Sequence, residues 1–149
     1  MAKLSESLRN YTLDTGSAKD ALTDFAVSFF DGAIPILPSD AVTGTKLITF
    51  TVDNDGVTGA TWGTAAVGIL SRTATELMSG TCLVGGEPTF YRIHLLAESP
   101  SSANITYHRI QGTLGLANTD GILDTTFFPM ILGTTYPLGN ITIPTFVGS

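Results

Sequence analysis

The sequence predicts one mainly β domain over residues 1–149, a single antiparallel β-sandwich or jelly roll preceded by a short N-terminal helical segment. Two observations carry this prediction. From residue 25 onward, short runs of β-branched and aromatic residues alternate with turn residues about every 8–12 positions, which is typical of all-β domains. Residues 1–24 instead have helical spacing of their apolar positions. A chain of 149 residues has the usual length of one domain.

The N-terminal segment is expected to form two short helices. Leu4, Leu8 and Tyr11 are spaced by four and three residues, which places them on one face of a helix. Gly16 is a helix stop signal, and residues 17–20 have the capping-box spacing that begins a second helix. This segment, residues 1–24, is therefore predicted as a helical arm before the β domain of residues 25–149.

Seven or eight short strands are expected after the arm. The predicted runs are 25–30, 46–52, 65–70, 77–84, 89–96, 104–114, 127–132 and 138–147. Asp31-Gly32 and the segment 53–56 are turns between runs. Pro35 and Pro38 cannot donate to a sheet ladder, so residues 33–44 are expected at an edge or in a loop.

The run 89–96 alternates most clearly and predicts a half-buried strand. Tyr91, Ile93 and Leu95 share one face, and Phe90, Arg92 and His94 share the other. We expect His94 on the solvent side of this strand or at an interface.

The chain has few charged residues, yet its hydropathy pattern does not predict a membrane protein. Charged residues make up 13% of it and the mean hydropathy is +0.29, whereas soluble domains average about 25% charged residues. No apolar run approaches the roughly 20 residues of a spanning helix, and no secretory h-region is expected near the N-terminus. Threonine and serine can cover part of the surface. Contact with neighbouring protein is expected to cover the rest.

Several classes of chemistry lack their residue patterns. The net charge is −6 and the seven basic residues are scattered, so no nucleic acid is expected as a partner. The acidic segment 53–56 lacks the glycine and glutamate positions of a calcium loop. His94 and His108 have no neighbours at metal-ligand spacing, and Cys82 is expected as a small buried hydrophobe. We therefore expect no metal and no cofactor.

Motifs of nucleophilic and phosphate chemistry are equally missing. The sequence contains no Gly-x-Ser-x-Gly elbow and no glycine-rich phosphate loop. No catalytic residue is predicted and the chain is expected to be non-enzymatic, although a triad assembled from distant loops stays open.

Trp62 has two interpretations. A sole tryptophan between small polar residues can stack on a sugar, or it can close one end of the core or contact a subunit.

The arrangement of small-residue motifs resembles the small virion structural proteins of tailed bacteriophages and prophages. The segments that carry the resemblance are 8–17, 40–47, 67–71, 79–81, 89–92, 109–115 and 141–144. The resemblance implies a virion protein made in the host bacterial cytoplasm. Its implied partners are the major capsid protein or other virion proteins, together with further copies of itself.

The leading functional hypothesis is a capsid decoration or cement protein that binds at subunit seams. The alternatives are a tail or neck component and a carbohydrate-binding jelly roll for host attachment. The candidate interface residues are Leu4, Leu8, Tyr11, Leu13 and Trp62. The arm that carries the first four is expected to dock either on a neighbour or on its own domain.

Overall fold

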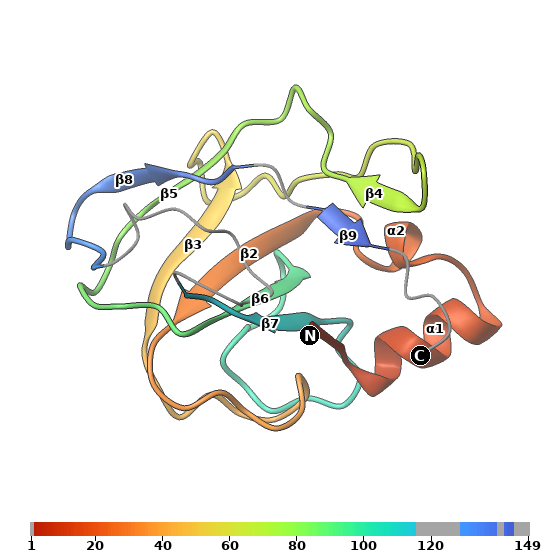
Figure 1. Cartoon of the computed structure of the whole chain (residues 1–149), viewed down its shortest axis with the longest axis horizontal. Helices are drawn as coiled ribbons and strands as arrows, with labels where there is room; N and C mark the ends of the chain where they lie inside the picture. The colour runs from red at the N-terminus through yellow and green to blue at the C-terminus, as the bar shows by residue number, and fades with distance from the viewer. Residues whose placement is uncertain (1, 116–128, 140–141, 145–149) are drawn as a thin grey trace.

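The structure is a computed structural model that describes residues 2–115, 129–139 and 142–144 (Figure 1). The elements in chain order are β1 (Lys3–Leu4), α1 (Glu6–Asp14), α2 (Ala18–Ala21), β2 (Phe25–Phe30), β3 (Lys46–Val52), β4 (Ile69–Ser71), β5 (Met78–Thr81), β6 (Phe90–Leu95), β7 (Ile110–Thr113), β8 (Thr135–Pro137) and β9 (Thr142–Pro144).

Most described strands belong to one sheet. Its order is β1-β7-β6-β2-β3-β5-β8, and β4 pairs with β9 in a separate two-stranded sheet. Every described strand pair is antiparallel. The prediction of a mainly β fold with a short N-terminal helical segment is confirmed, and its finer form, a two-layered sandwich or jelly roll, stays a prediction.

The second helix begins at the cap that the sequence predicts, whereas the first begins later than predicted. Leu4, expected on one helix face with Leu8 and Tyr11, lies in β1, and α1 begins at Glu6. The Ser5 hydroxyl accepts a hydrogen bond from the Leu8 N–H at the start of α1. Ser17 and Asp20 form the expected capping box of α2, in which each side chain accepts from the other's backbone N–H. α1 ends at Asp14, shortly before the predicted stop at Gly16.

An aromatic core lies on one face of the sheet. Phe25, Phe29 and Phe50 are fully buried there. Phe29 meets Phe50 edge-on with 4.9 Å between ring centroids, and Phe25 stacks on Trp62 at 4.3 Å. Strand alternation places Ser28 of β2 and Arg92 of β6 on the opposite face. Loops 33–44 and 97–107 lie below the sheet in Figure 1, and their hydrogen bonds to Arg92 and Arg109 tie them to this second face.

Several predicted strands are shorter in the structure. Residues 104–109 form a loop, and β7 occupies only Ile110–Thr113 of the predicted run 104–114. The reason is local, because the Asn104 side chain accepts from the Thr106 N–H and bends the backbone. The run 77–84 narrows to β5, the run 65–70 keeps only its end in β4, and the run 138–147 contains β9. Of the predicted run 127–132, residues 127 and 128 lie outside the described residues, and 129–132 form no strand beyond the isolated bridge of Met130 to Gly86.

The segment 53–56 is a turn, as predicted. Asp53 and Asn54 have φ values of 53° and 56°, and the Asp55 carboxylate accepts from the N–H groups of Val57 and Thr58. Its acidic side chains therefore shape the backbone between β3 and the following segment.

Candidate functional site

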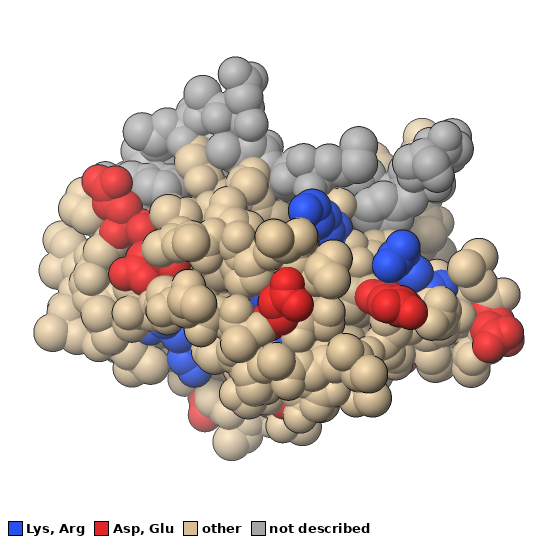
Figure 2. All heavy atoms as spheres, turned by 90° about the horizontal axis from the view of Figure 1, so that it is seen from below, with Lys and Arg blue, Asp and Glu red and all other residues tan. Residues whose placement is uncertain are grey.

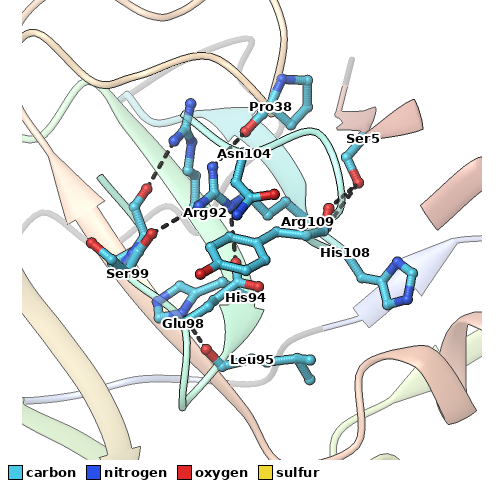
Figure 3. Close-up of polar contacts among 12 residues, drawn as sticks. Ser5, Pro38, Arg92, His94, Leu95, Glu98, Ser99, Asn104, His108 and Arg109 are labelled. Carbon is cyan, nitrogen blue, oxygen red and sulfur yellow. Dashed lines mark hydrogen bonds and ion pairs between the residues drawn. The ribbon is translucent and has the colours of Figure 1, made fainter. Parts of the chain in front are cut away.

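A buried polar cluster joins the second face of the sheet to the two loops that cover it (Figure 3). Arg92 from β6 has 0% of its surface exposed. Its Nε donates to Gln111 Oε1 at 2.9 Å, and its two terminal nitrogens donate to the carbonyls of Pro100 and Asp40, each at 2.8 Å. One guanidinium thus connects two strands with both loops.

Arg109, just before β7, is equally buried and binds neighbouring backbone carbonyls of the two loops. Its Nε donates to Glu98 Oε1 at 2.9 Å, the ion pair of the cluster. The terminal nitrogens donate to Ser99, Ser102 and Pro38, at 2.8 Å, 2.9 Å and 3.1 Å. Its guanidinium carbon also lies 5.0 Å from the centre of the Tyr107 ring.

These side chains determine the conformation of residues 33–40. Prolines contribute no N–H, so the carbonyls of this loop need donors from elsewhere. Gln111 Nε2 donates to the Pro35 carbonyl at 2.8 Å and Lys3 Nζ donates to the Ile36 carbonyl at 3.0 Å. Together with the two arginines, these donors hold the loop at four carbonyls.

The cluster holds two buried cations and one buried carboxylate. Burial lowers the pKa of Arg92 to about 10, and the charge of Arg109 acts in the same direction. Burial raises the pKa of Glu98, while the hydrogen bond from Arg109 opposes that rise. With a pKa of about 10, Arg92 stays charged at neutral pH, and a buried guanidinium needs the carbonyl acceptors that the loops provide.

His94 lies on the same face and is buried, so the expectation of a solvent-side histidine is wrong. It is 2% exposed because loop residues cover the strand face that alternation left open. Its Nδ1 lies 2.9 Å from the Leu95 carbonyl, which only accepts, so Nδ1 carries the proton. Its Nε2 then accepts from the Ser28 hydroxyl at 2.9 Å. Burial lowers the pKa of His94 to about 4, which keeps the ring neutral at pH 7.

The Ser28–His94 pair has the hydrogen bond of a nucleophile and its base, but the groups around it lack the other features of a catalytic triad. A backbone carbonyl, instead of a carboxylate, orients the ring. Ser28 is fully buried and also hydrogen-bonded to Thr49 Oγ1 at 2.9 Å. We interpret the pair as a link between β2 and β6.

The predicted interface residues have different positions. Leu8 is fully buried, and Leu4 and Tyr11 pack partly buried against the core. The Ser5 hydroxyl donates to the Tyr107 carbonyl and accepts from the Arg109 N–H, so the arm docks on its own domain. Leu13 alone projects outward, with 86% of its surface exposed.

Trp62 is 4% exposed and stacks on Phe25. The structure therefore places it in the core, where its ring offers no open face to a sugar.

Apart from Leu13, the exposed aliphatic residues are the feature that sequence analysis missed. They are Ile34, Ile36, Leu37, Val57, Val67, Ile69, Leu77, Leu83, Val84, Ile105, Ile131 and Leu132. Three of them, Ile34, Ile36 and Leu37, lie in the loop that the buried cluster holds. In Figure 2, which views the molecule from this side, most of the visible surface is uncharged. Loop residues have no sequence periodicity, so no signal in the sequence could have identified this exposed aliphatic surface.

Val67 is the most exposed of these residues, at 98%, and its backbone is strained. Its φ is 52°, and with Gly68 at φ 74° it forms the tip of a hairpin closed by Ala66 and Ile69. A β-branched residue is disfavoured in this conformation, so neither folding nor burial accounts for valine here.

The described residues contain no group of three or more His, Cys, Asp or Glu side chains placed to hold a metal ion. Across the same residues, no helix has the length and apolarity needed to cross a bilayer. Cys82 is a free, buried cysteine, as predicted, and burial raises the pKa of its thiol.

Comparisons with protein-family models, with curated proteins and with solved structures found no match to this chain.

Proposed function

We propose that this chain is a structural protein of a bacteriophage particle, a decoration or cement protein that binds at seams between capsid subunits. The proposal joins the sequence resemblance to the surface of the structure. A protein that works by adhesion needs apolar surface presented in a rigid form, and this chain has such a surface.

The observation that carries the proposal is the loop 33–40. Its carbonyls are held by Arg92, Arg109, Gln111 and Lys3, while its aliphatic side chains face solvent. A loop ordered in advance loses little conformational entropy on binding, which favours affinity. Depletion of charge around such residues is typical of the buried centre of a protein interface.

The physical mechanism is stabilisation by mass action. A protein that binds the assembled shell and not its separated subunits stabilises the shell in proportion to RT ln(1 + [L]/Kd). No chemical step is required, and the buried cluster supplies rigidity.

The test uses particles of the phage or prophage that encodes the chain, prepared with and without it. We expect the chain to co-sediment with particles and to raise the temperature at which they release DNA. An Ile36→Ser, Leu37→Ser double variant should lose most of this binding, because both side chains are more than half exposed and available for contact. Val57→Ser, which removes an aliphatic residue of similar exposure from the turn after β3, is the matched control.

Particles that rupture at the same temperature without the chain would refute the cement role. Electron microscopy of the particle separates the remaining structural roles, because density at the tail or neck in place of the shell would replace the proposal by the tail or neck alternative.

A further inference from the structure

A cavity of about 380 Å³ opens beside the loop that the buried cluster holds. Its lining combines Ile34, Pro35 and Ile36 of the loop with the Gln111–Thr113 end of β7 and with Lys3. Lys3 is the charged residue among them. Its exposed ammonium donates one hydrogen bond to the Ile36 carbonyl and has further N–H groups to offer. The ligand that fits is therefore an aliphatic side chain with a carboxylate beside it.

The chain itself presents this combination. Among the exposed large aliphatic residues that the structure describes, Leu13 and Leu77 have an acidic residue directly beside them in sequence. Glu76, the neighbour of Leu77, has both carboxylate oxygens occupied by the backbone and hydroxyl of Thr61. Asp14, the neighbour of Leu13, is exposed and makes no side-chain hydrogen bond or ion pair with the described residues.

The position of Asp14 adds an electrostatic reason. It is the last residue of α1, and the last turn of that helix has no basic residue. The carboxyl end of a helix already carries a partial negative charge, so an acidic group there is unfavourable until a cation approaches. A lysine from another molecule would satisfy both the carboxylate and the helix end.

We infer that the Leu13–Asp14 end of α1 in one copy of this chain docks into the Lys3–Ile36 cavity of a second copy. The Leu13 side chain enters between Ile34 and Ile36, and the Asp14 carboxylate pairs with the Lys3 ammonium. Each copy carries both halves of the contact, so repeated pairing can close into a symmetric oligomer. The inference deepens the proposed structural role, and rests on it, by naming a partner for the loop surface.

The test is sedimentation velocity of the purified chain between 1 and 100 μM at low salt, which are conditions chosen for about micromolar affinity. We expect concentration-dependent association that Leu13→Ser weakens about tenfold or more, as expected for a leucine side chain that loses its burial. Lys3→Glu and Asp14→Lys should each weaken association, and the double variant with both charges exchanged should recover it. Val57→Ser is the control that leaves association unchanged.

Thermal unfolding of every variant verifies that the fold is kept. A wild-type chain that stays monomeric at 100 μM (a concentration about a hundredfold above a micromolar Kd), or folded single variants whose charge exchange restores nothing, would overturn the inference. The proposed virion role is judged separately by particle binding of the wild-type chain, so a monomer that binds particles would overturn only the self-contact.

Discussion

Acidification should destabilise the fold through one side chain, His94. In the folded chain its ring is neutral, because Nε2 accepts from Ser28 and Nδ1 donates to the Leu95 carbonyl in a buried site. The charged groups that bear on it are Arg92, Arg109 and Lys46, all positive and all lowering its pKa. Protonation of His94 is therefore unfavourable in the folded chain, because the charged ring would be buried near three cations. In the unfolded chain the charged ring is solvated by water.

The magnitude follows from the two pKa values. The folded pKa is about 4 and the ordinary value is 6.5, so between these pH values the unfolded chain binds more protons than the folded chain. The contribution of His94 is thus fully present above pH 6.5 and is lost as the pH falls through 4. At 1.36 kcal/mol per pKa unit, the free energy of unfolding should fall by about 2 kcal/mol from pH 7 to pH 5 and by about 3 kcal/mol at pH 4.

The assay is urea unfolding of the wild type and of His94→Gln across this pH range. The glutamine oxygen can accept from Ser28 as Nε2 does, but it does not titrate. The difference in unfolding free energy between the two proteins should change by about 2 kcal/mol between pH 7 and pH 5. His108→Gln is the comparison variant: burial also lowers the pKa of this histidine, but it is only partly buried, so its removal should change the pH dependence less than His94→Gln does. Parallel pH curves for wild type and His94→Gln would refute the assignment of a neutral, buried histidine.

Three further predictions concern stability. Arg109→Met should cost about 3–5 kcal/mol in urea unfolding, because it leaves the Glu98 carboxylate and three loop carbonyls without their donor; a cost below about 1 kcal/mol would contradict the cluster. Val67→Asn should raise the free energy of unfolding by about 1 kcal/mol, since asparagine tolerates a positive φ better than valine, and an unchanged melting temperature would argue against strain. Ser17→Ala should lower the free energy of unfolding by about 1 kcal/mol through loss of the α2 capping box, with Thr12→Ser, which keeps the hydroxyl that donates to the Arg9 carbonyl in α1, as the neutral control.

The sequence predicted those elements whose signals are local. Residues 25–30 and 46–52 match β2 and β3 to the residue, because each run is bounded by turn residues that cannot continue a strand. The capping box at Ser17 likewise depends only on residues within one turn of helix. The predicted strand over residues 104–109 was wrong for a local reason as well. An Asx turn at Asn104 outweighs the alternation of the residues that follow it.

The buried cluster could not be predicted from strand alternation. Alternation shows which side chains share a face of the sheet, but it does not show which loops cover that face. The two sets of residues on β6 were correctly separated, yet the set with Arg92 and His94 is buried throughout, whereas Ile93 is the one fully buried member of the other set. What buries them is a pair of loops joined by hydrogen bonds between residues far apart in sequence, such as Arg92 with Asp40. The proline content of the loop 33–44 was the available signal, since carbonyls without neighbouring N–H groups need donors from elsewhere.

The cluster also changes what the low charge of the chain means. Of the seven basic residues, Arg72, Arg92 and Arg109 are buried, so nearly half of the positive charge is removed from the surface. Among the acidic residues that the structure describes, Glu98 is the buried one, and it pairs with Arg109. The surface is therefore poorer in cations than the composition suggests, and each exposed lysine has more influence on which partner can approach. Lys3 lies at the cavity beside the loop, which makes a carboxylate-bearing partner at that site the electrostatically favoured one.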